Sequence, residues 1–428
     1  MIEIRRDERR TVVIAIVYFA LVMAGWFMLR PLREDSGSSI PAGERATLYT
    51  WTFVCSLPAV PLYSWLVSVF ERRKLLVALY AFFCVNLAAF WWCQSQGWFT
   101  GTLDRVFYVW ASVYNLLIVS IFWSVVVDVF DSGQGKRLFG IVAAGGSIGA
   151  LVGSQVTKSY FEHLARSGLY LIAMGGLVAC AACAIALLRT ATVHDARTPR
   201  DARGTGGSWL GGFTLVLGRP YLLALAAQTL CITFGSTILY NEKLELVAAV
   251  YPRREDRPEV FATIDQYTNV ATLIGQSLIT AWMLRRFGLR VALGFLPVLG
   301  LLGFAALAWL LGASSIQHAL YLVVGFEVLR KAAHHVFEKP AREVLFTVVS
   351  REEKYKAKEF LDVSVYRGGD CLAGWVYPAL QSAGRTLPAW SAVPLSALAF
   401  LVTGFLAREQ RRLAEPKAAA GTDVASSG

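Results

Sequence analysis

Residues 11–30 read TVVIAIVYFALVMAGWFMLR, a run that carries no charged side chain before Arg30. A helix needs about 20 consecutive apolar residues to cross a bilayer, so this run predicts a transmembrane helix. Similar runs follow along the chain. They lie at about 47–70, 75–93, 106–130, 138–160, 168–188, 220–248, 259–284, 289–311, 317–348, 359–381 and 389–407. The sequence therefore predicts an all-α polytopic membrane protein with twelve transmembrane helices.

The composition agrees with this fold class. Of the 428 residues, 56% are hydrophobic and only 17% are charged. So few charges cannot cover the surface of soluble domains with this much apolar sequence. We therefore exclude a soluble protein, and we expect the chain to lie among membrane lipids.

The net charge of +11 does not indicate binding to a nucleic acid polymer, because the basic residues gather at alternate ends of the runs. With the N-terminus inside, the predicted cytosolic segments hold 25 Lys and Arg residues and the predicted outer loops hold eight. This ratio follows the positive-inside rule. It predicts an integral protein of the plasma (inner) membrane with both termini in the cytosol.

A polar segment near the middle of the chain predicts two halves. The basic, Gly-rich stretch HDARTPRDARGTGGS (residues 194–208) lies between the sixth and seventh runs and is typical of a linker. We therefore predict a six-helix bundle at 1–188, a cytosolic linker at 189–219, a second six-helix bundle at 220–408 and a disordered cytosolic tail at 409–428. Two six-helix bundles resemble the organisation of the major facilitator superfamily, whose basic loop signature survives in part as ERRK (residues 71–74).

The tenth run carries more charge than a lipid-facing helix tolerates. Glu327, Lys331, His334 and Glu338 recur at i, i+4, i+7 and i+11, which places them on one helical face. Between residues 327 and 342 there are four Lys or Arg residues and only two Glu residues. A polar cavity with this surplus of positive charge favours an anionic solute. The alternative is that these charges form ion pairs that lock the helix to a neighbour, while Lys339 and Arg342 extend to the inner surface.

Other spans add charges at comparable depth. Arg367 and Asp370 lie three residues apart in the eleventh run, and Asp265 lies in the eighth. In the first run, Pro31 is expected to break the helix just after Arg30, with Arg33 one turn further on.

Two further patterns have simpler interpretations. Gly145, Gly149 and Gly153 recur every four residues in the fifth run, and this spacing predicts close packing against another helix. His334, His335 and Glu338 do not predict a metal centre, because the other histidines lie in or beside loops. We expect no metal and no cofactor.

Three stretches carry a resemblance to a known family. They are LRPLRED (29–35), IFWSVVVDVFDSGQGKRLFG (121–140) and KPAREVLFTVVSREEKYKAKEFLDVSVYRGGDCLAGW (339–375). They resemble the ATP/ADP translocases of plastids and obligate intracellular bacteria, a branch of the facilitator-like carriers. The resemblance implies exchange of nucleotides or transport of a related anionic solute by alternating access, with basic residues of spans one and eleven on the phosphates.

The resemblance also implies roles for single residues. Arg33 stands where those carriers place a functional Lys, and the positive charge is kept, although Arg is a planar fork and Lys a point charge. Asp370 stands where they place a second important Lys, so the sign of the charge is reversed there. Arg367, Arg330 and Lys331 then remain as anion contacts. Asp370 either changes protonation during transport or pairs with Arg367 or Lys331.

These observations predict a secondary transporter of an organic anion, and not an enzyme. The predicted substrate contacts are Arg30, Arg33, Arg330, Lys331 and Arg367. The predicted coupling and gating residues are Asp265, Glu327, His334 and Asp370, with Asp128, Lys136, Arg137, Glu353 and Lys356 as cytosolic contacts between helices. Three alternatives remain: a proton-coupled symporter or exporter of a less charged solute, a membrane enzyme that modifies lipids with His334 or His335 as base, and a non-transporting sensor.

Overall fold

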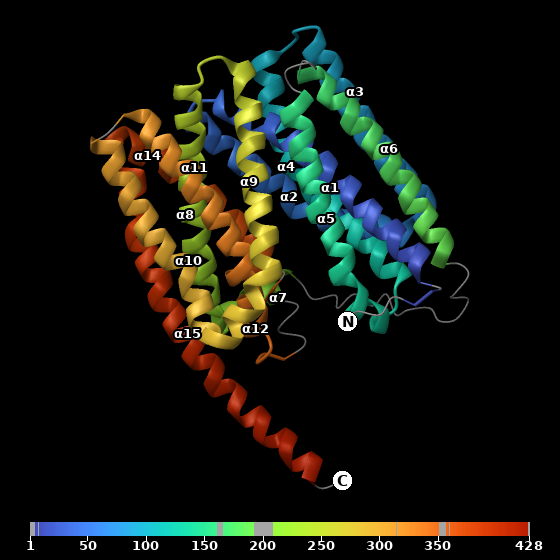
Figure 1. Ribbon diagram of the computed structural model, residues 1–428, viewed down its shortest axis with the longest axis vertical. Helices are drawn as coiled ribbons and strands as arrows, with labels where there is room; N and C mark the ends of the chain where they lie inside the picture. Colours follow the sequence, from blue (N-terminus) through green and yellow to red (C-terminus); the bar gives the residue numbers. More distant parts are fainter. Residues whose placement is uncertain are drawn as a thin grey trace. The chain divides into compact units, whose positions relative to one another are not determined.

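The computed structural model describes residues 5–6, 8–160, 166–191, 209–313, 315–350, 357–358 and 360–426. All regular elements in these ranges are helices (Figure 1). The first half of the chain forms α1 (Arg9–Ser38), α2 (Ala42–Val69), α3 (Arg72–Ser95), α4 (Thr100–Val129), α5 (Ser132–Tyr160) and α6 (Arg166–Ala191). The second half begins with α7 (Trp209–Gly218), α8 (Pro220–Val250), η1 (Arg254–Asp256), α9 (Arg257–Leu278) and α10 (Thr280–Ala313). It continues with α11 (Ile316–Ala333), η2 (His334–Glu338), α12 (Lys339–Leu345), η3 (Phe360–Val365), α14 (Tyr366–Ala383) and α15 (Leu387–Ser426).

Nine helices in the described ranges are long and apolar enough to cross a membrane, namely α1 to α6, α8, α10 and α15. They coincide with nine of the twelve apolar runs. The other three runs are also helical, as α9, as α11 with η2 and α12, and as η3 with α14. They are more polar because they carry the charges discussed below. The prediction of an all-helical membrane fold is therefore confirmed for the described residues, while the count of twelve spans stays a prediction.

By its internal contacts the chain divides into two compact units, residues 1–202 with 247–270 and residues 203–246 with 271–428. The units are not continuous in sequence. The segment 247–270, which holds the end of α8, η1 and the first part of α9, packs with the first unit. Each unit is described by itself.

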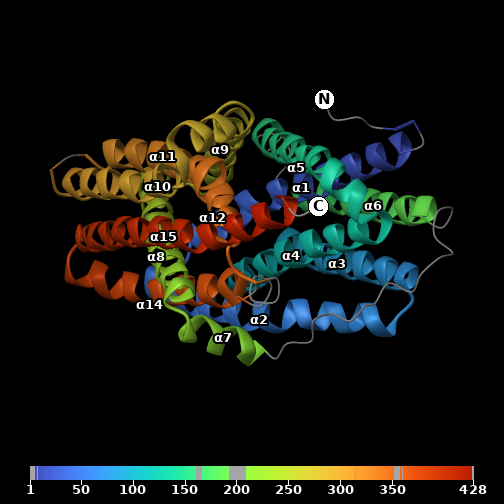
Figure 2. The same ribbon diagram turned by 90° about the horizontal axis from the view of Figure 1, so that it is seen from below.

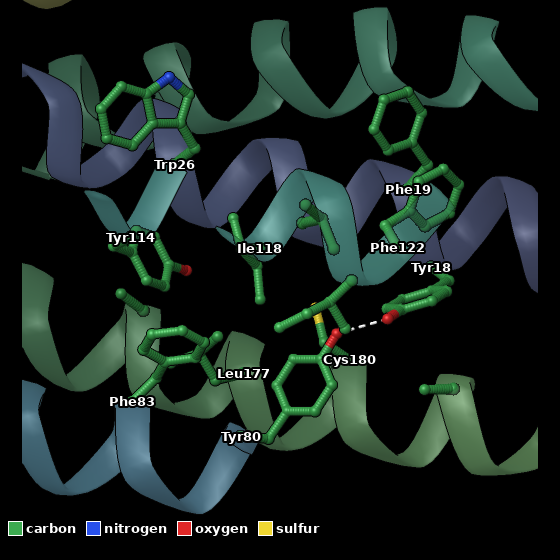
Figure 3. Close-up of a cluster of buried hydrophobic side chains, with 14 of the residues drawn as sticks. Tyr18, Phe19, Trp26, Tyr80, Phe83, Tyr114, Ile118, Phe122, Leu177 and Cys180 are labelled. Carbon is green, nitrogen blue, oxygen red and sulfur yellow. Dashed lines mark hydrogen bonds between the residues drawn. The ribbon is translucent and has the colours of Figure 1, made fainter. Parts of the chain in front are cut away.

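In the first unit, α1 packs against α4, α5 and α6 (Figure 2). Its core is aromatic: Phe19 stacks on Phe122 with ring centroids 4.2 Å apart, and the hydroxyl groups of Tyr18 and Tyr80 lie 2.5 Å apart beside Cys180 (Figure 3). A hydrogen bond between the two phenols satisfies polar groups that would otherwise be buried alone.

The glycine pattern of α5 lies against α1, which confirms the predicted close packing. A Cβ atom added to Gly145, Gly149 or Gly153 would overlap the backbone carbonyl oxygen of Ile16, Ala20 or Ala24, respectively. The two backbones approach closely only because glycine has no side chain. This contact fixes α1, and with it the charged end of α1.

In the second unit, α10 lies along α15 and also packs against α11 and η2 (Figure 1). Gly288 interrupts α10 with φ 76° and ψ −179°, a backbone conformation that favours glycine. This position coincides with the predicted loop between the eighth and ninth runs. At the other end, α15 continues to Ser426, through the residues predicted as a tail, because Ala-rich sequence favours a helix.

Two short π-helices occur in the second unit: η2 lies within one charged segment and η3 directly precedes the other. A π-turn inserts an extra residue into the helix and shifts the direction of the side chains that follow it. Such turns are common at functional sites. Here η2 contains His334 and Glu338, and η3 leads directly into α14 with Arg367 and Asp370.

Candidate functional site

The end of α1 carries the first group of charges. The sequence predicted that Pro31 breaks the helix, and this prediction is wrong, because α1 continues to Ser38 with Pro31 buried inside it. Proline removes a single backbone hydrogen bond, and helices that pack around a transmembrane helix compensate for that loss. The continuous helix keeps Arg30, Arg33 and Glu34 within one turn of each other.

Arg30 and Arg33 are both paired in the first unit. The Nη1 atom of Arg30 lies 3.0 Å from Oδ1 of Asp265, and its Nε lies 3.7 Å from Oε1 of Glu34. Arg33 lies 3.6 Å from the same Glu34 oxygen, donates a 2.8 Å hydrogen bond to Oγ of Ser112, and stacks 4.0 Å above the ring of Tyr108. Two guanidinium groups thus face two buried carboxylates.

Both arginines keep some contact with solvent. Their side chains are 17% and 15% exposed, whereas those of Glu34 and Asp265 are 3% and 4% exposed. A buried carboxylate needs a cation or several hydrogen bonds, since an unpaired buried charge is costly. A phosphate that approaches Arg30 or Arg33 therefore competes with Glu34 and Asp265.

The second group of charges joins α8 to α11 in the second unit. Glu327 of α11 accepts contacts from two lysines on the same oxygen, Oε1: Nζ of Lys331 at 2.6 Å and Nζ of Lys243 at 3.2 Å. Lys331 is one helical turn after Glu327, as the sequence predicted, whereas Lys243 comes from α8. The alternative of internal ion pairs within the tenth run therefore holds for Glu327 and Lys331.

Arg330 points to α8 and differs from the other cations. It is 8% exposed, donates to the carbonyl oxygen of Ile232 at 2.7 Å and to Oγ of Ser236, and lies 5.9 Å from the ring of Phe304. Within the described residues, the contacts of this guanidinium are thus with neutral groups. A Cβ at Gly235 would lie 3.2 Å from Cε2 of Phe304 and 3.4 Å from Nη2 of Arg330, so this glycine packs closely against both side chains.

His334 and Glu338 form a pair within η2. The Nδ1 atom of His334 lies 2.9 Å from Oε2 of Glu338, and the side chains are 34% and 3% exposed. Together with Glu327 and Lys331, this pair shows that the predicted i, i+4, i+7, i+11 face is held together by its own charges. His334, the predicted coupling residue, remains half-buried at the edge of this face.

Arg367 and Asp370 lie at the start of α14, 3.7 Å apart, with side chains 24% and 20% exposed. Thr237 of α8 donates a 2.7 Å hydrogen bond to Oδ1 of Asp370. Of the two open interpretations of Asp370, the structure places the carboxylate beside Arg367, so each partly neutralises the other.

The predicted cytosolic contacts take other partners within the first unit. Asp128 lies 2.8 Å from Nη2 of Arg72, which belongs to the ERRK stretch, and Arg137 lies 2.6 Å from Oε1 of Glu8. Burial alone would raise the pKa of Glu8, but the hydrogen bonds from Arg137, the Arg5 backbone and Gln134 outweigh it and hold this pKa below its usual value.

Three members of the predicted cytosolic group are not placed. The side chain of Lys136 in α5 lies outside the described residues, as do Glu353 and Lys356 as a whole. Their predicted contacts stay predictions.

The main omission of the sequence analysis is α8. Lys243, Ser236 and Thr237 complete the charged groups of α11 and α14, yet none of them is among the predicted site residues. A signal was present: hydroxyl side chains recur at 229, 233 and 237, and Asn241, Glu242 and Lys243 interrupt an otherwise apolar run. Such a polar face on a spanning helix marks the side that faces other protein groups.

No group of three or more His, Cys, Asp and Glu side chains suited to a metal ion occurs in the described part of the chain. Apart from Arg330, the cations described above lie beside carboxylates, and such pairs can exchange one anionic partner for another.

Comparison with known proteins points to carriers. No family model matches the chain. The chain is 23% identical over 290 residues to the chloroplastic ADP,ATP carrier protein 1 of Arabidopsis thaliana, a match that covers 60% of this chain and 45% of the relative. It is 21% identical over 295 residues to ADP,ATP carrier protein 1 of Chlamydia trachomatis serovar D, with 62% and 56% covered. The chain thus spans about half the length of the curated relatives that it matches.

Solved structures share the fold over nearly the whole chain. The nucleoside transporter NupG matches with a TM-score of 0.62 at 13% identity, over 95% of this chain and all of that one. A bacterial homologue of the iron transporter ferroportin matches with a TM-score of 0.65 at 12% identity, covering 93% and 99%. A POT family peptide transporter in an auto-inhibited state gives 0.65 at 13% identity, covering 94% and 97%.

These relatives are carriers and these neighbours are transporters, and the chain shares the fold of the neighbours over 93% to 95% of its length. The chain is an integral membrane protein with this fold, and the resemblance of its motifs to the ATP/ADP translocases is matched by sequence similarity to the ADP,ATP carriers.

Proposed function

We propose that this protein is a secondary transporter that exchanges a nucleotide or a related phosphorylated metabolite across the membrane by alternating access. The observation that carries this proposal is the similarity over about 290 residues to the ADP,ATP carriers. It is supported by the charged groups of α1, α8, α11 and α14, which lie in helices that the fold otherwise fills with apolar side chains.

The substrate contacts that we propose are Arg30, Arg33, Arg330, Lys331 and Arg367. Four of them pair with a carboxylate at 2.6 to 3.7 Å and are 15% to 29% exposed. A phosphoryl oxygen carries the same kind of charge as a carboxylate oxygen and can take its place. Transport then requires the substrate to outcompete these carboxylates, which keeps the anion from being held too tightly.

The coupling residues that we propose are the carboxylates of these pairs, Asp265, Glu327 and Asp370, together with His334. One observation favours proton coupling as a second candidate mode. His334 lies 2.9 Å from Glu338 and is 34% exposed, so a proton can reach this pair from solvent. In that mode the protein carries a less charged solute as a proton-coupled symporter or exporter.

The arrangement in the membrane is also part of the proposal. We propose twelve spans in two six-helix bundles, 1–188 and 220–408, joined by the cytosolic linker 189–219, in the plasma (inner) membrane with both termini in the cytosol. The nine apolar helices and the three charged ones support this count. The charge bias of the loops supports the orientation. Asp128, Lys136, Arg137, Glu353 and Lys356 remain our proposed cytosolic contacts of the transport cycle.

Flux into proteoliposomes tests the function. Purified protein is reconstituted with or without internal ADP. Uptake of labelled ATP, ADP and phosphate is then measured with equal pH on both sides and with an inwardly directed proton gradient. We expect uptake of a nucleotide that depends on internal nucleotide. Uptake that needs only a pH gradient supports the proton-coupled mode instead. Chemical conversion of the solute, or binding without flux, would overturn the proposal in favour of an enzyme or a sensor.

A further inference from the structure

One carboxylate in the second unit faces two lysines from different helices. Oε1 of Glu327 lies 2.6 Å from Nζ of Lys331 in α11 and 3.2 Å from Nζ of Lys243 in α8. A single negative charge therefore meets two positive charges. Since one carboxylate can neutralise only one ammonium group, this trio carries a surplus of one positive charge.

The two lysines differ in their access to solvent. The side chain of Lys243 is 2% exposed, that of Glu327 is 4% exposed, and that of Lys331 is 29% exposed. Lys243 also lies 4.8 Å from the ring of Tyr240, which favours its positive charge. Lys243 is therefore enclosed along its whole length, whereas part of the Lys331 side chain reaches solvent and its Nζ atom is buried against Glu327.

This asymmetry indicates different roles for the two lysines, an inference that rests on the proposed function. We propose that Lys243 is a positioning residue: it neutralises Glu327 so that Lys331 can leave this carboxylate and bind a phosphoryl oxygen of the substrate. Lys331 then alternates between two anionic partners, while the pair of Lys243 and Glu327 stays intact.

The physical reason is the cost of an unpaired buried charge. If Lys331 were the sole counter-ion of Glu327, moving it to the substrate would leave a carboxylate buried without a partner, which is strongly unfavourable. Lys331 would then stay on Glu327, and the site would lose a contact for phosphate. With Lys243 in place, the departure of Lys331 leaves a balanced pair behind.

The test uses the full-length chain with the variants Lys243→Met, Lys243→Arg and the double variant Lys243→Met with Glu327→Gln. ADP binding is measured by calorimetry and exchange is measured in proteoliposomes. For Lys243→Met we expect the Kd and the KM for ADP to rise about tenfold, equal to ~1.4 kcal/mol, with a much smaller change in the maximal rate. For the double variant we expect the Kd for ADP to return to within about twofold of the parent, since Glu327 then no longer holds Lys331.

Lys243→Arg is the matched control, because it keeps the positive charge beside Glu327, and we expect it to bind ADP like the parent. If Lys243 had only a structural role, its replacement by Met would lower the amount of folded protein without raising KM more than it lowers the maximal rate. That defect would also not be rescued by removing the charge of Glu327. A double variant as defective as Lys243→Met would overturn the proposal.

A measurement without substrate separates this proposal from the proposed function. The rate at which Lys331 reacts with a small amine-modifying reagent is followed by mass spectrometry. We expect a slower reaction in Lys243→Met, where Lys331 is held by Glu327, and a faster one in the double variant. If the parent binds no nucleotide or phosphate, the proposed function fails while this measurement still decides the role of Lys243. Equal labelling in all variants would show that Lys243 does not control Lys331.

Discussion

Arg254 lies 2.9 Å from Oδ2 of Asp35, a residue 219 positions earlier in the chain. The same guanidinium lies 2.6 Å from Oδ1 of Asp104 at the start of α4. Burial alone would lower the pKa of Arg254, but its contacts with Asp104 and Asp35 outweigh this effect and raise the pKa above its usual value. Arg254 is therefore a permanent cation that ties the segment between α8 and α9 to α1 and α4 within the first unit.

Loss of this cation should destabilise the first unit. We expect Arg254→Gln to lower the free energy of unfolding by about 2 kcal/mol, less than the ~3–5 kcal/mol of a fully buried pair because the Arg254 side chain is partly exposed. Thermal unfolding in detergent measures the effect. Arg253→Gln is the control, since Arg253 is 81% exposed and pairs at the surface with Asp256. If both variants melt at the same temperature, the contact with Asp35 does not stabilise the fold.

The pair of Arg30 and Asp265 should behave as one unit. Each of Arg30→Gln and Asp265→Asn is expected to cost about 3 kcal/mol, because each leaves a charge without its partner in a largely buried site. The double variant should cost less than the sum of the two by about 1–3 kcal/mol. A double-mutant cycle on thermal unfolding measures this coupling. The surface pair of Arg105 and Glu44 gives the reference cycle, with an expected coupling below about 1 kcal/mol. Additive effects at Arg30 and Asp265 would mean that the two charges do not interact.

A side chain added at the glycines of α5 that contact α1 should destabilise the fold. We expect Gly149→Ala to lower the free energy of unfolding by about 1–3 kcal/mol, because the new methyl group overlaps the carbonyl oxygen of Ala20. Gly175→Ala in α6 is the control, since no atom lies within 4 Å of its added Cβ. That substitution should be neutral or stabilising by up to about 1 kcal/mol, as alanine favours a helix. Similar losses in the two variants would argue against the close approach.

Asp370 should limit the affinity for highly charged substrates. Its carboxylate lies 3.7 Å from Arg367 and competes with phosphate for this guanidinium. We therefore expect Asp370→Asn to lower the Kd for ATP about five- to tenfold, or roughly 1 kcal/mol, and to affect ADP less. Thr237→Val is the control, since it removes the hydrogen bond to Asp370 and keeps the charge. Binding is measured by calorimetry, and an unchanged ratio of the ATP and ADP affinities would contradict the prediction.

Contacts within one helix could be predicted from the sequence. The i, i+4 pairs of Glu327 with Lys331 and of His334 with Glu338 follow from the helical period, because residues four apart lie on the same face. The glycine spacing likewise predicted a close helix contact, though not that its partner is α1. The error at Pro31 has the opposite cause: neighbouring helices support a proline that would end an isolated helix.

Contacts between helices could not be predicted in this way. The spans contain several cations and several carboxylates, and the hydropathy pattern does not tell which carboxylate pairs with which cation. Asp265 therefore appeared as a coupling residue rather than as the partner of Arg30, and Lys243 had no role until α8 was placed beside α11.

The apolar runs and the charges within them by themselves determined that this chain is a helical membrane protein with polar sites among its helices. These features depend on local composition and period, and the cost of exposing polar groups to lipid leaves few other folds. Only the tertiary structure decided which charges neutralise each other and which cations stay half exposed. That outcome depends on a few ångströms of distance between helices far apart in the chain, and the strength of an ion pair changes steeply over that distance and with burial.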